Sequence, residues 1–380
     1  MKSKKIFICI FLSLIIIIPL LAVFISCNDD IFHTISLEEK VRTAFIKGSP
    51  TNFVIFKDSL YVASGKTLYI FDGSSWTTHE MDSKIIQLAA TSSLLYVLLF
   101  EDITPLKFTI KKSSFGSNRN WIDIKVSNYK EFEDYTEIEN IQSANNILYI
   151  GARKPNKNTI DSVIFKYDGN NFAKTSIPAG SSSSLRGAVY NGETFICTSG
   201  GIYRDNSAAP IPLSDDSSSK PDYIGIIKLE DNTIAAITRN GLLYQIDTVA
   251  TKKAEFPDSR RASGAIATCK VDNKYFLLAG RQDISYSTSS GYTFGYVELE
   301  LNASGGIEKD TFKVPGTEDP SSIEINERYS SSLGVVPVNH LVQYKNTLFA
   351  ATHQKGVWSY RDRNNAPSWN SEEEEIPVNE

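Results

Sequence analysis

The sequence has few of the side chains that most often carry catalysis or bind metal ions. Its 380 residues include only four histidines and four cysteines. The histidines are His33, His79, His340 and His353, and none stands at metal-ligand spacing from another or from a cysteine. The chain also contains no Gly-x-Ser-x-Gly elbow, phosphate-binding loop, dinucleotide-binding fingerprint or calcium-binding loop. The sequence therefore predicts no catalytic residue, no metal ligand and no cofactor-binding residue.

An excess of positive charge is also missing. The chain has 39 Lys and Arg against 44 Asp and Glu, for a formal net charge of −5. Three of the lysines, Lys2, Lys4 and Lys5, stand at the extreme N-terminus, so the remainder has 36 basic residues against 44 acidic ones and a net charge of about −8. Because such a balance disfavours binding to polyanions, we expect no nucleic-acid partner.

The first 26 residues have the composition of an export signal. The three lysines precede residues 6–25, an apolar run with only Ser13 and Pro19 as exceptions. A positive head followed by an apolar core is typical of a secretory signal peptide. An uncleaved membrane anchor is the alternative, since about 20 apolar residues also span a bilayer.

The end of this run favours the first interpretation. Val23-Phe24-Ile25-Ser26-Cys27 resembles the lipobox of bacterial lipoproteins, in which a small residue precedes the cysteine. Phe24 departs from the usual leucine. The resemblance implies cleavage after Ser26, diacylation of Cys27, and a mature protein that is exported from the cytoplasm and lipid-anchored to a membrane of the cell envelope.

A repeated pattern of short apolar runs dominates the rest of the chain. Its clearest copy is residues 60–76, LYVASGKTLYIFDGSSW, in which Ser64-Gly65 and Asp72-Gly73 each close one run. Asp-Gly between β-branched and aromatic runs is a strong hairpin signal, because glycine accepts a positive φ. With residues 53–56 upstream and Trp76 downstream, the pattern predicts four short antiparallel strands.

The same pattern recurs along the chain. Seven copies begin at Leu60, Leu95, Leu148, Thr194, Ile234, Tyr275 and Leu348. The next position is aromatic in six of the seven copies and is held by Tyr61, Tyr96, Tyr149, Phe195, Ala235, Phe276 and Phe349. A second aromatic column follows at Tyr69, Phe108, Phe165, Tyr203, Tyr244, Tyr286 and Trp358. The chain therefore contains seven copies of one supersecondary unit.

Seven such units predict an all-β fold, a seven-bladed β-propeller of four-stranded antiparallel blades. One unit cannot bury both of its faces, whereas a closed ring of units buries them and leaves no long sheet edge. Six and eight blades are the alternatives. We divide the chain into a signal peptide (residues 1–26), a lipidated N-terminus and tether (27–48), the β-propeller (49–376) and a C-terminal tail (377–380).

Two further features bear on the propeller. Cys197 and Cys269 belong to the fourth and sixth units, which are not neighbours in a ring, so we expect buried free thiols and no disulfide. The acidic run at residues 372–375 is typical of a solvated tail or an edge strand.

A degenerate motif and a long insertion lie toward the C-terminus. Residues 287–294, STSSGYTF, resemble the Asp-box of sialidase-like propellers, although Ser289 replaces the aspartate and Phe294 the tryptophan. The Asp-box is a turn between blade strands, so this resemblance implies a propeller and no catalytic residue. The longest insertion, residues 302–337, is either a binding loop or a disordered or decorative one.

Two classes of function remain open. The first is a binding or scaffold module of the cell envelope, whose partner is an envelope protein or a glycan. A propeller presents a broad face built from loops, and a lipid tether keeps that face near a membrane. The alternative is a carbohydrate-active hydrolase or lyase on a sialidase-like propeller. Its paired carboxylates are set in space and cannot be chosen from one sequence, and the Arg-Ile-Pro signature of sialidases is missing near the start of the domain.

Overall fold

The structure is a computed structural model of the chain. It describes residues 46–103, 106–114, 120–125, 132, 135, 137–154, 161–180, 182–214, 220–257, 261–271, 273–282, 295–313, 333, 337–363 and 366–372. All of them lie in one compact unit, Ala44–Glu374. Cys27, the signal sequence, the Asp-box-like segment and the C-terminal tail lie outside the described residues.

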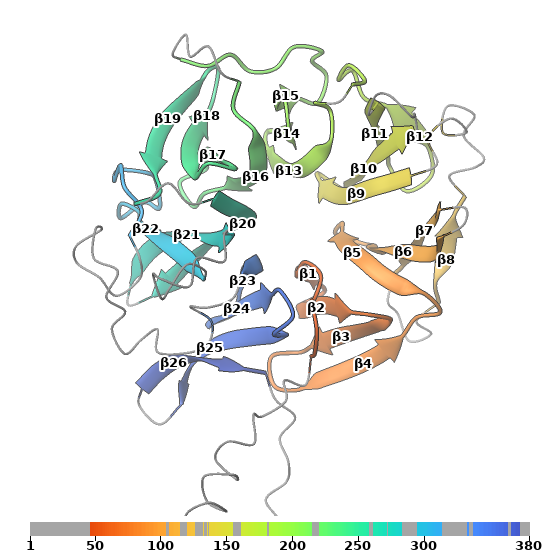
Figure 1. Ribbon diagram of the computed structural model, residues 1–380, viewed down its shortest axis with the longest axis horizontal. Coiled ribbons are helices and arrows are strands. Elements are labelled where there is room, and N and C mark those ends of the chain that lie inside the picture. Colours follow the sequence, from red (N-terminus) through yellow and green to blue (C-terminus); the bar gives the residue numbers. More distant parts are fainter. Residues whose placement is uncertain are drawn as a thin grey trace, which may run out of the picture. The chain divides into compact units, whose positions relative to one another are not determined.

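The described strands form seven antiparallel sheets arranged as a ring (Figure 1), which confirms the seven-bladed β-propeller. Blade 1 is β1 (Val54–Phe56), β2 (Ser59–Ser64), β3 (Thr67–Phe71) and β4 (Trp76–Glu80). Blade 2 is β5 (Lys84–Ala90), β6 (Leu95–Ile103), β7 (Leu106–Ser113) and β8 (Ile122–Ile124). Blade 3 is β9 (Glu137–Ala144), β10 (Ile147–Lys154), β11 (Asp161–Tyr167) and β12 (Phe172–Lys174).

The remaining four blades follow in chain order. Blade 4 is β13 (Leu185–Asn191), β14 (Glu193–Thr198) and β15 (Gly201–Arg204). Blade 5 is β16 (Tyr223–Lys228), β17 (Ile234–Thr238), β18 (Leu242–Ile246) and β19 (Ala250–Glu255). Blade 6 is β20 (Arg261–Val271), β21 (Lys274–Gln282) and β22 (Tyr296–Glu300). Blade 7 is β23 (Val338–Tyr344), β24 (Thr347–Thr352), β25 (Val357–Arg363) and β26 (Ala366–Ser371).

In blades 4 and 6 a bridged segment takes the place of the fourth strand. Tyr203 of β15 pairs with Pro210, and Glu298 of β22 pairs with Lys313. The segment of blade 4 also reaches the next sheet, because Leu213 pairs with Ala250 of blade 5. The segment of blade 6 reaches the preceding sheet, because Thr311 pairs with Glu255 of blade 5. Among all the residues that the structure describes, no helix is long and apolar enough to cross a membrane.

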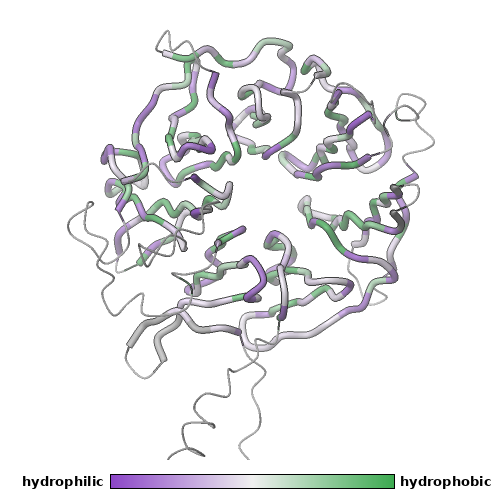
Figure 2. Tube along the Cα trace, in the orientation of Figure 1, coloured by the Kyte–Doolittle hydropathy of each residue, from purple (hydrophilic) through white to green (hydrophobic). Residues whose placement is uncertain are grey.

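The residues at which the seven predicted copies begin, from Leu60 to Leu348, all lie on the second strand of a blade. In the second aromatic column, six residues lie on third strands. The seventh, Tyr286, lies outside the described residues, and the third strand of blade 6 begins only at Tyr296. Figure 2 shows hydrophobic residues recurring along the strands of the blades. These side chains fill the space between neighbouring sheets; Tyr96 of blade 2 and Phe165 of blade 3, for example, share one cluster.

The connections between strands divide between two faces. Because antiparallel strands alternate in direction, turns from first to second strand and from third to fourth strand lie on one face, here called the turn face. Turns from second to third strand, and the links between blades, lie on the opposite crossover face. On the turn face, Lys57 and Asp58 have φ values of 47° and 57°, and Asn145 and Asn146 have 47° and 61°. Left-handed pairs of this kind are typical of two-residue hairpins.

The predicted Asp-Gly turns also lie on the turn face. Asp72 Oδ1 accepts hydrogen bonds from the backbone N–H groups of Ser74 and Ser75, at 2.7 and 2.9 Å. In blade 3, Asp168 Oδ1 repeats this arrangement at 2.8 and 2.7 Å. These bonds to the charged form hold the pKa of both aspartates below its ordinary value. The turn face is therefore built from rigid, internally bonded hairpins.

Amide side chains tie neighbouring blades together through their first strands. Asn52 donates to the carbonyl of Leu88 at 2.8 Å and accepts from its N–H at 2.9 Å. Gln343 makes the same pair of bonds with the backbone of Lys270. Each side-chain amide thereby satisfies a backbone N–H and a backbone C=O group of a first strand that has no neighbouring strand on that side.

Blade 7 meets blade 1 without exchanging a strand. Gly48 forms a parallel bridge with Lys355, and its carbonyl accepts from Gly356 N–H at 2.9 Å. Ile46, within the segment assigned to the tether, is fully buried. Phe53 N–H donates to His340 Nδ1 at 3.2 Å. The chain thus joins the propeller on the crossover face, beside the turn between β24 and β25.

Glu372 completes this closure. It directly follows the outer strand β26, as the edge-strand alternative allows, but its side chain is buried, which corrects the solvated-tail alternative at this residue. It is 4% exposed and accepts hydrogen bonds from Trp76 Nε1 (2.9 Å) and from the hydroxyl of Ser359. Burial of this carboxylate is compensated because it accepts hydrogen bonds from two donors, one in blade 1 and one in blade 7. Cys197 and Cys269 are free and buried, as expected, and burial raises the pKa of both thiols.

Candidate functional site

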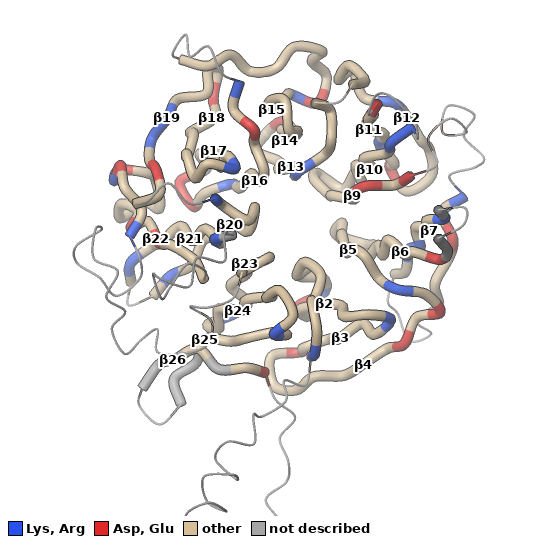
Figure 3. Tube along the Cα trace, viewed as in Figure 1, with Lys and Arg blue, Asp and Glu red and all other residues tan. Residues whose placement is uncertain are grey.

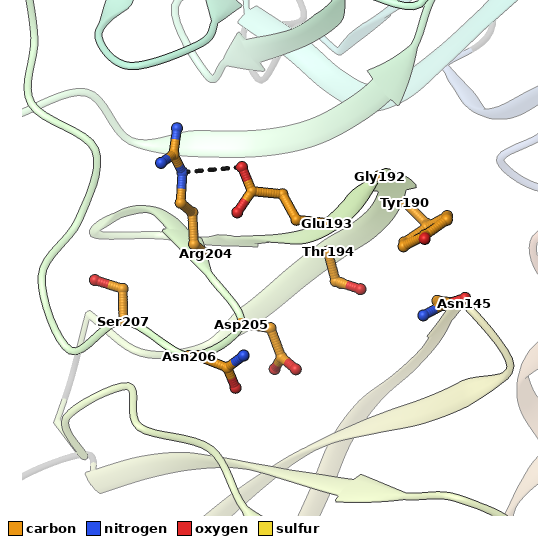
Figure 4. Close-up of a pocket in the computed structure, with 9 residues that line it drawn as sticks. All are labelled: Asn145, Tyr190, Gly192, Glu193, Thr194, Arg204, Asp205, Asn206 and Ser207. Atoms are coloured by element: carbon orange, nitrogen blue, oxygen red, sulfur yellow. Dashed lines mark ion pairs between the residues drawn. The ribbon is translucent and has the colours of Figure 1, made fainter.

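A polar pocket opens on the turn face of blade 4, next to blade 3, with a volume of about 440 Å³ (Figure 4). Its lining residues are Asn145, Tyr190, Gly192, Glu193, Thr194, Arg204, Asp205, Asn206 and Ser207. Asn145 comes from the β9–β10 hairpin, and the others come from the β13–β14 hairpin and the segment that follows β15. Turns that are adjacent only in the assembled ring therefore form the site.

Backbone hydrogen bonds fix the two turns that contribute most of the lining. Asp205 N–H donates to the carbonyl of Thr194 at 3.0 Å, and Ser207 N–H donates to the carbonyl of Arg204 at 2.9 Å. Gly192 has a φ of 76°, a conformation that lets the β13–β14 turn stay tight. The pocket is consequently largely pre-formed, as small-molecule sites usually are.

Two ion pairs balance the charge of the pocket. Arg204 Nε lies 3.3 Å from Glu193 Oε1, as Figure 4 shows. Lys166 Nζ, from β11 of blade 3, lies 2.7 Å from Asp205 Oδ2, and both of these side chains are mostly buried. Two carboxylates thus face two cations, and the pocket has no excess of either sign. Around the ring as a whole, Figure 3 shows both signs interspersed.

One polar atom of the lining, Asp205 Oδ1, is buried and makes no hydrogen bond. Burial raises the pKa of the Tyr149 hydroxyl, which lies close to Thr194 and Asp205 but outside the lining. Buried polar atoms are nearly always satisfied by protein, water or ligand. Asp205 Oδ1 is therefore an acceptor that a bound molecule could use.

An aromatic side chain stands at the rim. Tyr190, near the end of β13, is 43% exposed and is one of the few large hydrophobic side chains at the surface of the described residues. Figure 4 shows its ring on the same side of the pocket as Asn145, across from Ser207. A ring in this position offers a flat apolar surface beside a set of hydrogen-bonding groups.

The pocket combines hydrogen-bonding side chains with two carboxylates, Glu193 and Asp205, each of which lies beside a cation. Over the residues that the structure describes, no group of three or more His, Cys, Asp or Glu side chains is arranged to hold a metal ion.

Sequence reasoning did not single out this pocket. Cys27 and residues 287–294 lie outside the described residues, as do residues 314–332 and 334–336 of the long insertion. The described part of the insertion is structural, because Phe312 is fully buried and Lys313 pairs with Glu298. The only sequence signals at the pocket were those of ordinary turns, such as Asn191-Gly192.

Comparisons with known proteins give the fold but no family. No protein-family model and no curated protein sequence matches the chain. Among solved structures, YCF48 from Cyanidioschyzon merolae is similar at a TM-score of 0.50 and 11% identity, over 83% of this chain and 96% of that one. A structure of YCF48 bound to D1 peptide is similar at a TM-score of 0.50 and 11% identity, over 84% of this chain and 96% of that one. An ancestral GH74 enzyme is similar at 0.50 and 14%, over 87% of this chain and 47% of that one.

Proposed function

We propose that this protein is a binding module of the bacterial cell envelope, tethered by a lipid on Cys27, that captures an envelope protein or a glycan in the pocket of blade 4. The observation that carries the proposal is the pocket itself. It is pre-formed on bonded turns, its ion pairs balance its charge, and it leaves one buried polar atom, Asp205 Oδ1, without a hydrogen-bond partner. Rigid sites of this kind bind without paying to order a loop.

The comparisons support a binding role in general terms. A propeller with a similar arrangement, YCF48, is known with a D1 peptide bound. At 11% identity this likeness concerns the fold, so it supports the use of such a propeller as a binder and says nothing of the ligand here.

The sequence supports the tether. Cys27 follows an apolar run and a small residue, as in lipoproteins. Within the described residues, Gly48 lies on the crossover face, whereas the pocket opens on the turn face.

A hydrolase or lyase is the second candidate, because Glu193 and Asp205 place two carboxylates in one pocket. Each of these carboxylates is engaged in an ion pair, with Arg204 or with Lys166, and we therefore favour the binding module. Turnover of a glycan by the purified domain, lost in Glu193→Gln, would establish the enzyme and refute the binding module.

Photo-crosslinking in the native envelope tests the proposed function. A photoreactive amino acid at position 206, in the pocket, should give one dominant adduct. The same amino acid at position 122, on the exposed outer strand of blade 2, should not. Equal adducts from both positions, or none from position 206, would refute a binding role for the pocket.

A further inference from the structure

We propose that the pocket of blade 4 recognises a neutral saccharide. This inference rests on the proposed function and names the chemical class of its ligand. The inference depends on the charge of the pocket, on its hydrogen-bonding side chains and on the position of Tyr190.

The charge of the pocket excludes ligands that depend on a strong opposite charge. Glu193 is paired with Arg204, and Asp205 with Lys166, so these four charges sum to zero. The described charges at the pocket therefore give no net attraction to a phosphate, a sulfate, a carboxylate or an ammonium group. A neutral molecule meets a site of this kind without burying an uncompensated charge.

The polar groups of the pocket match hydroxyls better than they match a peptide. A sugar hydroxyl donates one hydrogen bond and accepts others. The lining offers one unpartnered acceptor, Asp205 Oδ1. The side-chain amides of Asn145 and Asn206 also line the pocket, each with both a donor and an acceptor. A sugar hydroxyl can donate to Asp205 Oδ1 and accept from an amide at the same time.

Tyr190 supplies the apolar contact that a sugar ring needs. One face of a pyranose presents C–H groups, which pack on an aromatic ring in the way that other apolar groups do. The Tyr190 ring is exposed at one side of the pocket and has the amides and carboxylates within the same cavity (Figure 4). A peptide anchor would require a deeper apolar pocket, and the other eight lining residues supply none.

The experiment measures binding of the purified propeller to an array of neutral and acidic glycans, followed by titration of the best neutral one. Tyr190→Ala should weaken its affinity about tenfold, equivalent to ~1.4 kcal/mol. Tyr190→Phe keeps the ring and should stay within about twofold of the original affinity. Ile122→Ala, which shortens an exposed side chain outside the pocket, is the control and should change nothing. Circular dichroism confirms that each variant is folded.

Binding to no glycan, or only to acidic ones, would overturn the inference, as would equal affinities for Tyr190→Ala and Ile122→Ala. The proposed function is tested independently of the saccharide. If no glycan on the array binds but position 206 still crosslinks to one envelope protein, the saccharide inference is wrong and the binding module is supported. If position 206 also gives no adduct, both the saccharide inference and the binding module are refuted.

Discussion

Removal of the Glu372 carboxylate should destabilise the ring at its closure. In Glu372→Ala, the hydroxyl of Ser359, which is fully buried, and the indole N–H of Trp76, which is partly buried, lose their acceptor. A buried donor without a partner costs about 1–3 kcal/mol, and water can reach the indole more easily than the hydroxyl, so we expect a total loss of ~2–4 kcal/mol. Urea unfolding followed by tryptophan fluorescence measures the loss as a lower midpoint.

Two comparisons make this prediction specific. Glu255→Ala removes a carboxylate that pairs with Lys252 at the surface, and it should cost no more than about 0.5 kcal/mol. Trp76→Phe keeps the ring packing against Phe71, whose centroid lies 4.9 Å away, and removes only the N–H. The double variant with Glu372→Ala should therefore lose less than the sum of the two single losses. A loss in Glu372→Ala as small as that in Glu255→Ala would refute the role of Glu372 in closure.

Three further predictions concern other parts of the chain. Burial lowers the pKa of His340 from 6.5 to about 4, so the unfolded state takes up its proton first. Stability should fall as the pH drops from about 6.5 to about 4, by at most ~3 kcal/mol, and this fall should be smaller in His340→Gln by urea unfolding. Tyr149→Phe removes a fully buried hydroxyl that lies close to Thr194 and Asp205 outside the pocket lining, so the melting temperature should change little in thermal unfolding. Cys27→Ala should abolish acyl labelling of the protein, and unchanged labelling would contradict the lipobox.

The blade repeat was predictable because its signals are local. Alternating apolar residues and Asp-Gly turns each specify a strand or a hairpin within a few residues. The first residues of the seven copies, from Leu60 to Leu348, therefore all lie on second strands, although the connections between the copies vary greatly in length. Tyr286, predicted for the second aromatic column, lies outside the described residues, and the described third strand of blade 6 begins at Tyr296.

The pocket and the closure were not predictable from local signals. Asn145 and Asp205 become neighbours only when blades 3 and 4 pack, and each taken alone belongs to an ordinary turn. Glu372 lies in an acidic run that is typical of a solvated tail. Its burial depends on Trp76, which stands 296 positions earlier in the chain. Contacts of this separation are set by ring closure and not by the residues around either partner.

The pocket's role as the ligand site is tested most directly by backbone amide chemical shifts of the propeller during titration with the neutral glycan selected from the array. Shifts should appear at Gly192, Asn206 and Ser207 on the turn face and remain absent at Gly65 and Gly356 on the crossover face. Shifts confined to the crossover face, or none at the pocket at a saturating glycan concentration, would contradict the account.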